Sequence, residues 1–239
     1  MDREHKRILD SYERLEGRVQ AGPRFFGYEN LAHVYRVNQR HQETLRLLSA
    51  CAFHPLTDVR ILDVGCGNGN MLRQFLQWRA TPSHLAGIEL RAEPIEQARA
   101  LNPGIDIRCG SAIEMPWENE SFDLVCQHTV FTSILDDTMK RQIAAEMNRV
   151  LRPGGAVLWY DFFLNNPGNR DVKGIGKHEL YSLFPQYKIN LRKISLAPPI
   201  ARRIPERLLP VVYPALAAIP LLRTHYLALC QKPGTKSAH

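Results

Sequence analysis

Asp63 and the three glycines that follow it, Gly65, Gly67 and Gly69, are the residues of this chain best suited to binding a small ligand. Glycines at every second position allow positive φ angles and let a ligand approach the backbone, which a Cβ would block. A phosphate-binding turn carries no central acid and often supplies a lysine, because its ligand is anionic. The carboxylate of Asp63 therefore disfavours a pyrophosphate and favours a ligand with a cationic amino group.

A second acid, Glu89, ends an apolar segment roughly 20 residues after this turn, at the place where an acid can accept hydrogen bonds from ribose hydroxyls. With Asp63, the glycines and Glu89 in these positions, the sequence resembles class I S-adenosylmethionine-dependent methyltransferases. Their first motif reads acid-x-Gly-x-Gly-x-Gly, and their second strand ends in an acid. The resemblance implies S-adenosylmethionine as cofactor.

The resemblance also implies which residues contact the cofactor. The residues at the positions that border the methionine part are Asp63, Gly65, Cys66, Gly67 and Gly69. Those for the ribose and adenine are Glu89 and Leu90, and those for the adenine edge are Ser111, Ala112 and Ile113. We add Gln127, near the end of a later expected strand, to this cofactor-binding set. Many family members have an aspartate where this chain has Ser111, and a serine hydroxyl bonds an exocyclic amine less strongly. No metal site is expected.

Three residues at the ends of later strands are candidates for catalysis. His128 follows the expected strand 122–127, where acceptor and cofactor methyl should meet, and a neutral imidazole can accept a proton near pH 7. A hydrogen bond to the cofactor is the alternative role for this histidine. Tyr160 and Asp161 end the expected strand 156–161, and since successive strand residues face opposite sides, at most one should reach the acceptor. Asp161 is the better candidate for a base, and Tyr160 is the better candidate for a wall of the acceptor site.

The segment 126–131 lacks the tetrapeptide of enzymes that methylate exocyclic amines of nucleic-acid bases, which is Asn or Asp, two prolines and an aromatic residue. The resemblance therefore implies a methyltransferase that acts on a small molecule. We expect O-methylation of a specialised metabolite or a glycan precursor, the latter anionic or lipid-linked. An RNA methyltransferase and a non-methylating S-adenosylmethionine-binding protein of the same fold are the alternatives.

The elements that must position these residues follow from the alternation of apolar segments and amphipathic stretches. The expected strands span 60–64, 84–90, 105–109, 122–127, 156–161, 187–196 and 226–232. The expected helices between them span 68–78, 93–101, 136–151 and 177–184, and Pro153 with two glycines stops the third before its strand. Short strand–helix repeats predict parallel strands, and the resemblance implies an antiparallel last strand. The expected fold is α/β, a doubly wound seven-stranded sheet.

The chain divides into an expected N-terminal helical lid, 1–57, and a cofactor-binding domain, 58–239. Two amphipathic patterns, 3–16 and 30–52, form the lid. In the family such helices cover the cofactor and one wall of the substrate cleft; a docked stabilising helix is the alternative. The strand directions that the resemblance implies place residues 197–225, which connect the last two strands, at the edge where ligands bind, so we expect them to form an insert over the site.

Charge is concentrated at the end of the chain. Residues 188–239 contain nine lysines and arginines against one acid, a net charge of +8, whereas residues 1–187 contain 22 basic and 23 acidic residues, a net charge of −1. Within the insert, arginines at 202, 203, 207 and 223 surround the apolar stretch 208–222, whose three prolines and length exclude a span of about 20 apolar residues.

A local positive field attracts phosphate, carboxylate or an anionic membrane surface, so the basic insert predicts an anionic or lipid-linked acceptor, or peripheral membrane contact. Packing in the core is the alternative for its apolar stretch. Nucleic acid is a less favoured partner, because no aromatic residues are interleaved with the basic ones. The charged segment 1–18 lacks the apolar core of a signal peptide, and the five cysteines are unclustered, so we expect a cytoplasmic protein in a reducing compartment.

Overall fold

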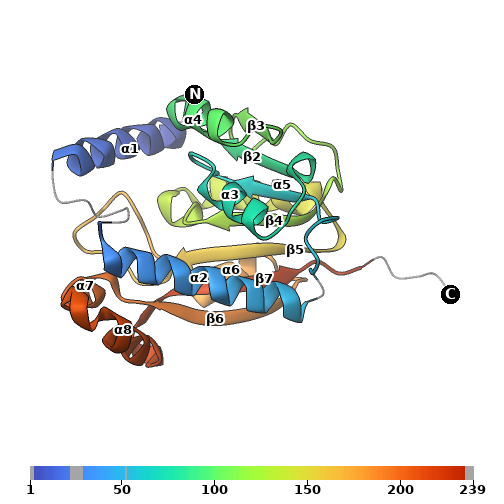
Figure 1. Cartoon of the computed structure of the whole chain (residues 1–239). Coiled ribbons are helices and arrows are strands. Elements are labelled where there is room, and N and C mark those ends of the chain that lie inside the picture. Colours follow the sequence, from blue (N-terminus) through green and yellow to red (C-terminus); the bar gives the residue numbers. More distant parts are fainter. Residues whose placement is uncertain (1–2, 22–28, 52, 235–239) are drawn as a thin grey trace.

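The computed structural model describes residues 3–21, 29–51 and 53–234, with only the backbone described for 16–21 (Figure 1). Seven strands form one sheet in the order β3-β2-β1-β4-β5-β7-β6. The strands are β1 (Ile61–Val64), β2 (Leu85–Glu89), β3 (Asp106–Cys109), β4 (Phe122–His128), β5 (Leu151–Phe162), β6 (Lys188–Leu196) and β7 (Arg223–Gln231). Strands β1 to β5 pair in parallel, and β7 runs antiparallel to both of its neighbours. The expected mostly parallel, doubly wound sheet is confirmed.

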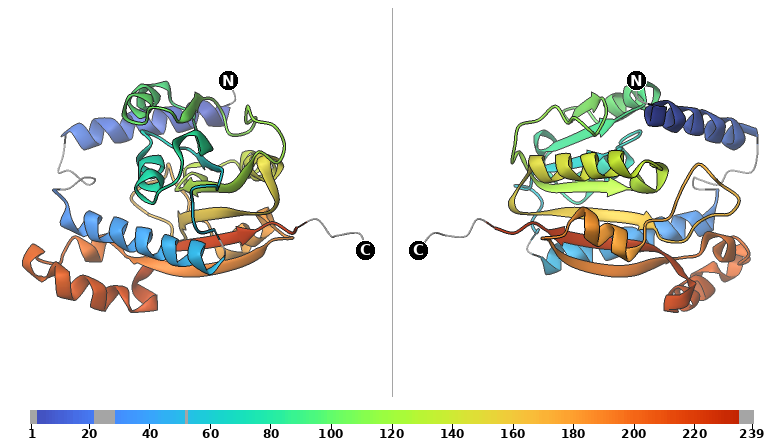
Figure 2. Two further views of the ribbon diagram at one scale, coloured as in Figure 1. Left: turned by 45° about the vertical axis from the view of Figure 1, so that its right-hand side comes forward. Right: turned by 180° about the vertical axis from the view of Figure 1, so that it is seen from behind.

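Eight α-helices are present in the described part of the chain, together with short 3-10 turns. The helices are α1 (Arg3–Ala21), α2 (Leu31–Ala50), α3 (Asn70–Gln77), α4 (Ala92–Leu101), α5 (Asp137–Val150), α6 (Lys177–Leu183), α7 (Pro198–Ala201) and α8 (Leu209–Ala217). The 3-10 turns are η1 (Pro82–His84), η2 (Phe131–Ser133), η3 (Glu206–Leu208) and η4 (Pro220–Leu222). Helices α2, α3 and α4 pack on one face of the sheet, and α5, α6 and the first turns of α1 pack on the other (Figure 2).

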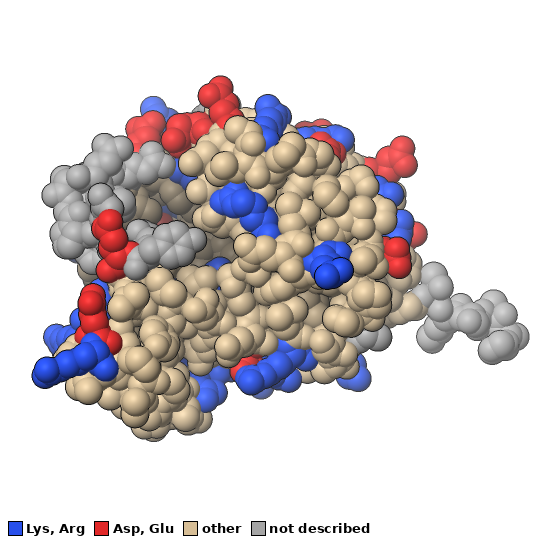
Figure 3. All heavy atoms as spheres, in the orientation of Figure 1, with Lys and Arg blue, Asp and Glu red and all other residues tan. Residues whose placement is uncertain are grey.

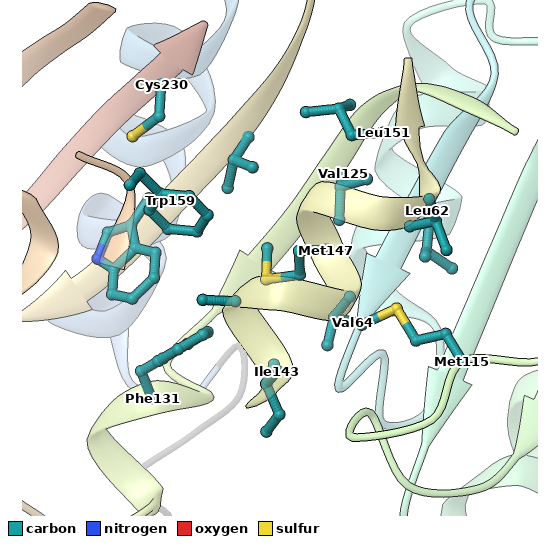
Figure 4. Packing of buried hydrophobic residues seen from close by; sticks show 14 of the residues in the cluster. Leu62, Val64, Met115, Val125, Phe131, Ile143, Met147, Leu151, Trp159 and Cys230 are labelled. Atoms are coloured by element: carbon teal, nitrogen blue, oxygen red, sulfur yellow. The ribbon is translucent and has the colours of Figure 1, made fainter. Parts of the chain in front are cut away.

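The core on the α5 side is built around Trp159, which is fully buried in the middle of β5 (Figure 4). Its ring contacts Phe131 at a centroid distance of 4.4 Å and Phe184 at 6.1 Å. The i, i+4 pair Ile143 and Met147 of α5 packs into the same cluster, as a helix with one apolar face requires. This core holds the η2 turn, which carries Phe131, against the end of β5.

Strand β5 begins at Leu151 rather than at residue 156 as predicted, because Leu151 already pairs with Phe122. The proline and glycines that seemed to precede the strand lie inside it. A register shift between Phe122 and Leu124 accommodates them, and a Cβ at Gly155 would lie 2.7 Å from the carbonyl oxygen of Asp123. The close approach of the two backbones therefore explains why a glycine stands here, rather than a need to end the preceding helix.

Helix α2 packs on the sheet and also lines a cavity. Leu47 and Leu48, in its C-terminal half, are completely buried against the sheet. Its N-terminal half lies over the carboxyl ends of the strands, where His33, Arg36 and Arg40 line a cavity. The predicted end of this helix at residue 52 lies outside the described residues.

Asp136 caps α5, since its side chain accepts hydrogen bonds from the amides of Thr138 (2.7 Å) and Met139 (2.9 Å). Replacing Asp136 with alanine leaves these amides without their acceptor and is expected to lower the free energy of unfolding by about 1 kcal/mol. Urea denaturation measures the change. Glu118→Ala, which removes an exposed carboxylate from a loop, is the matched control and should leave stability within about 0.5 kcal/mol of the wild type.

Candidate functional site

The turn after β1 has the backbone that its glycines suggested. Gly65, Gly67 and Gly69 have φ angles of 69°, 52° and 76°. A Cβ at Gly65 would lie only 2.5 Å from Cγ2 of Val130, so a side chain is excluded there by space as well as by φ. The amide of Gly67 donates a hydrogen bond to Glu89 Oε2 at 2.9 Å, which ties the turn to the end of β2.

A small cavity of about 90 Å³ lies beside this turn, at the carboxyl ends of β1, β2 and β4. Of the predicted cofactor-binding residues, its walls include Gly65, Glu89, Leu90, Ser111 and Ala112. The rest of that set, Asp63, Cys66, Gly67, Gly69, Ile113 and Gln127, does not line it. The walls thus bring together the glycine turn, the acid of β2 and the loop after β3, as the resemblance implies.

Helix α1 forms one wall of this cavity and covers it. His5 Nε2 lies 2.7 Å from Ser111 Oγ, and the amide of Leu135 donates to Glu4 Oε1 at 2.7 Å. Arg7 donates to the carbonyl oxygen of Ser133 at 2.5 Å and also binds Glu4, which favours the charged form of Glu4 and lowers its pKa against the opposing effect of burial. These contacts fix α1 over the predicted cofactor site.

A much larger cavity of about 840 Å³ adjoins the first, and Tyr12 and Ser133 line both. Its walls come from α1, α2, the end of β5, the loop 164–172, α7 and the start of β7. A volume of this size accommodates a substantial small molecule. The two cavities are therefore neighbouring compartments at the ligand-binding edge of the sheet.

His128 lies at the junction, since it lines the small cavity and its ring faces that of Tyr160, a wall of the large one, at a centroid distance of 6.1 Å. Its Nδ1 lies 3.8 Å from Asp63 Oδ1, too far for a hydrogen bond. Neither ring nitrogen has a hydrogen-bond partner among the described residues. Burial lowers the pKa of His128, with the Asp63 carboxylate opposing the shift, so the imidazole is neutral at pH 7.

Tyr160 forms a wall, as its place in the strand suggested. Its hydroxyl lies 3.0 Å from Ser195 Oγ, and its ring stacks on His225 at 4.9 Å. The guanidinium of Arg40 also lies over the ring of Tyr160, 5.1 Å from its centroid. Burial lowers the pKa of His225 to about 3, so this imidazole is a neutral, flat surface.

The structure places Asp161 and Gln127 on the opposite side of the sheet from Tyr160. Asp161 is completely buried, lines neither cavity, and accepts hydrogen bonds from Gln127 Nε2 (2.9 Å) and Thr132 Oγ1 (2.7 Å). Gln127 Oε1 accepts in turn from the amide of Val130 at 3.1 Å. Both side chains are committed to holding the turn after β4, so Asp161 does not reach an acceptor as a base and Gln127 offers no free group to the cofactor.

The basic residues predicted to hold an anion are separated by the fold. All three arginines are exposed, but Arg202 lines the large cavity whereas Arg203 and Arg207 do not. Sequence reasoning missed Arg36, which lines the cavity beside Arg40. The i, i+4 spacing of these two on one helix was the available signal. His225 was also missed, and nothing in its local sequence distinguishes it from other strand residues.

Comparisons with known proteins concern the family and the fold. Residues 61–155 match a family model described as a methyltransferase domain. The chain is 36% identical over 113 residues to phthiotriol/phenolphthiotriol dimycocerosates methyltransferase 1 of Mycobacterium ulcerans (strain Agy99), a match covering 46% of this chain and 40% of that protein. It is 29% identical over 196 residues to 27-O-demethylrifamycin SV methyltransferase of Amycolatopsis mediterranei (strain S699), covering 74% of this chain and 70% of that protein.

Among solved structures, a putative sarcosine dimethylglycine methyltransferase from Galdieria sulphuraria superposes with a TM-score of 0.61 at 15% identity, covering 83% of this chain and 86% of that one. At this identity the likeness concerns the fold alone. The family-model match runs from β1 to the start of β5, the part that carries the glycine turn and Glu89. By its motif, its sheet and these matches, the chain contains a class I S-adenosylmethionine-dependent methyltransferase domain.

Proposed function

We propose that this chain transfers a methyl group from S-adenosylmethionine to an oxygen atom of a small molecule held in the large cavity. The observation that carries the proposal is the imidazole of His128 at the junction of the two cavities, whose two ring nitrogens are buried and have no hydrogen-bond partner among the described residues. Buried polar atoms almost always have a hydrogen-bond partner, so two ring nitrogens without one at a cavity wall indicate a binding position for a ligand. A neutral imidazole there suits an acceptor hydroxyl.

The residues around the small cavity fit the cofactor. The glycine turn leaves its backbone open to a ligand, and the carboxylate of Glu89, a wall of the cavity, can accept hydrogen bonds from ribose hydroxyls. Asp63, 3% exposed behind the turn, supplies the negative charge that a cationic amino group needs. When bound, S-adenosylmethionine supplies an electrophilic methyl group.

The chain itself positions the acceptor, excludes water and supplies a group that accepts the proton. Tyr160, stacked on His225, fixes one wall of the acceptor site, and α1 excludes water from the other side. His128 then accepts the proton that the acceptor hydroxyl loses as it is methylated. The neutral state imposed by burial is the state that this step requires.

For the acceptor we propose a molecule with an anionic group. Arg36, Arg40 and Arg202 line the large cavity, and its only acidic wall residue among those described, Asp171, is already paired with Arg14 at 2.9 Å. The Nε atom of Arg40 is buried without a hydrogen-bond partner, so a carboxylate or phosphate would relieve a desolvated charge. Apolar walls such as Phe162, Leu164 and Pro198 favour a lipid-linked or polyketide-like body for the rest of the molecule.

Calorimetric titration with S-adenosylmethionine tests the cofactor half. We expect the wild type to bind and Asp63→Ala to bind at least about ten-fold more weakly, since a buried charge-assisted contact contributes about 1.5 kcal/mol or more. Asp58→Ala removes an exposed carboxylate from the loop before β1 and should bind as the wild type does. Circular dichroism confirms that both variants are folded.

Absence of binding in the wild type, or equal affinities for all three proteins, would contradict the cofactor assignment. Incubation with labelled S-adenosylmethionine and a panel of hydroxylated acids and lipid phosphates tests the acceptor half. Transfer of label to RNA but to none of these would instead favour the RNA methyltransferase alternative, and tight cofactor binding without transfer to any acceptor would favour the non-methylating one.

A further inference from the structure

The insert between β6 and β7 presents an apolar outer surface. Residues 208–222 contain only leucine, proline, valine, tyrosine, alanine and isoleucine. Four of the nine large apolar side chains that are exposed in the described part of the chain belong to this segment: Leu208, Val211, Ile219 and Leu221. Val211 is 74% exposed and Leu221 is 92% exposed. An ordinary surface helix would carry polar residues at such positions.

Packing of the insert explains only its inner side. Leu209, Tyr213 and Ala217, spaced four residues apart along α8, are buried against Ala32 of α2 and Leu196 of β6. Tyr213 also donates a hydrogen bond to Gln39 Oε1 at 3.1 Å. These contacts hold α8 in place and turn its other side outward, so the exposed apolar side chains are presented by a fixed element. Folding therefore does not require them.

Basic side chains border this apolar surface. Arg203 and Arg207 are exposed between α7 and α8, and Glu206 is the one acid in the insert. In Figure 3 the surface over α8, at the lower left, shows no charged side chain, while lysine and arginine side chains, with fewer acidic ones between them, flank it and follow the lower edge of the molecule. The combination of an apolar tip and a basic rim is typical of peripheral proteins that insert into anionic membranes.

We propose that the α8–η4 face, defined by Leu208, Val211, Ile219, Leu221, Arg203 and Arg207, docks on an anionic lipid bilayer. The apolar side chains enter the interface between headgroups and acyl chains, and the two arginines bind lipid phosphates. The charge of the rim favours this occupant over a second copy of the chain, because two copies would bring like charges together. No helix in the described residues is long and apolar enough to cross a bilayer, so the contact is peripheral.

Docking in this orientation brings the large cavity to the membrane. Pro198, Pro199, Ala201 and Arg202, in and directly after α7, are walls of that cavity, and the same short segment leads into the apolar tip. Helices α7 and α8 project together from one end of the sheet in every view (Figures 1 and 2). The cavity wall and the docking face are thus two sides of one insert. The docking itself does not depend on methyl transfer, so it can be tested without a known acceptor.

Co-sedimentation of the full chain with vesicles tests the proposal. Vesicles of phosphatidylcholine alone are compared with vesicles in which one third of the lipid is phosphatidylglycerol. We expect the wild type to bind the anionic vesicles and to bind less as salt is raised. Val211→Ser/Leu221→Ser should lower the partition coefficient at least about ten-fold, and Arg203→Ala and Arg207→Ala roughly five-fold each.

Matched controls come from other parts of the surface. Leu101→Ser replaces an exposed leucine on α4, and Arg141→Ala removes an exposed arginine on α5; both should bind vesicles as the wild type does. The proposal is overturned if the wild type does not bind anionic vesicles at low salt, or if the serine double variant binds them equally well. Light scattering that shows a wild-type dimer made monomeric by the same double variant would assign the face to self-association instead.

Discussion

Replacing His128 with glutamine is expected to lower kcat about 100-fold or more, because glutamine can hydrogen-bond an acceptor hydroxyl but cannot take its proton. The affinity for S-adenosylmethionine should change far less than kcat, since the glycine turn and Glu89 are untouched. Steady-state kinetics with any acceptor identified in the panel, together with calorimetry, separates the two effects. Such a split is the signature of a residue that acts in the transition state.

The pH dependence of the wild type provides a second measurement on the same residue. Burial holds the pKa of His128 below its ordinary value of 6.5, so the neutral base persists as the pH falls past that value. Activity should then decline only at more acidic pH, where the imidazole becomes protonated and can no longer accept. This decline should be missing from the residual activity of His128→Gln.

His178→Gln is the control, because His178 is exposed on α6, away from both cavities. It should keep the wild-type kcat and pH profile. If His128→Gln also kept the wild-type kcat and pH profile, His128 would only form a wall of the site. The acceptor would then release its proton to water, or would have no proton to release.

The second large effect concerns stability and the buried carboxyl of Asp161. Burial raises its pKa to about 7, although the hydrogen bonds from Thr132 and Gln127 and the charge of Lys140 act in the opposite direction. A protonated Asp161 fits its surroundings: it can donate to Thr132 Oγ1, which lies 3.3 Å from the carbonyl oxygen of Thr129 and can donate there instead. Asparagine has the same shape and donor, so Asp161→Asn mimics this neutral form.

The sign of the pH effect follows from the raised pKa. Below the unfolded-state pKa near 3.9, Asp161 is protonated whether the chain is folded or not, and its full contribution to stability is present. As the pH rises to about 7, the unfolded chain releases the proton while the folded chain retains it, so stability is lost. The unfolding free energy of the wild type, relative to Asp161→Asn, should therefore fall by at most about 4 kcal/mol between pH 4 and pH 7 and then level off.

Urea denaturation of both proteins at several pH values measures this difference. Asp58→Asn, at an exposed position, should follow the wild type across the range. Parallel curves for the wild type and Asp161→Asn would show that the carboxyl is already charged in the folded protein, with Gln127 and Thr132 outweighing burial. A separate Asp161→Ala variant should be destabilised at every pH by about 1 to 3 kcal/mol, because it leaves Gln127 Nε2 buried without its acceptor.

The predictable parts of this protein are those that short stretches of sequence encode. Asp63, the glycines and Glu89 all belong to one strand–turn–helix–strand unit, so their spacing predicted the turn and its place in the sheet. The parallel direction of β1 to β5 was confirmed for a related reason, since short strand–helix repeats predict parallel strands. The start of β5 was predicted too late because proline and glycine usually interrupt strands, whereas here a register shift between β4 and β5 accommodates them.

The acceptor side was less predictable because its contacts join distant residues. Tyr160 meets Ser195 and His225, and neither of these has a local signal that points to the cavity. Asp161 was a reasonable base from its strand position alone, and only the structure shows Gln127 and Thr132 occupying its two oxygens. Alternation along a strand assigns faces correctly, but it does not say which face is filled by the core.

The hydrogen bond from the amide of Ala197 to the carbonyl oxygen of Leu222, 2.8 Å long, closes the base of the insert. Its two ends are therefore as near to each other as those of a tight hairpin turn, and β6 and β7 would pair in the same register with residues 198–221 absent. Loop length adds little to the free energy of closing such a connection. Exchange of this segment for another can thus leave the pairing of β6 with β7 unchanged, so the proposed acceptor contacts and the proposed membrane contact can diverge while the cofactor half stays the same.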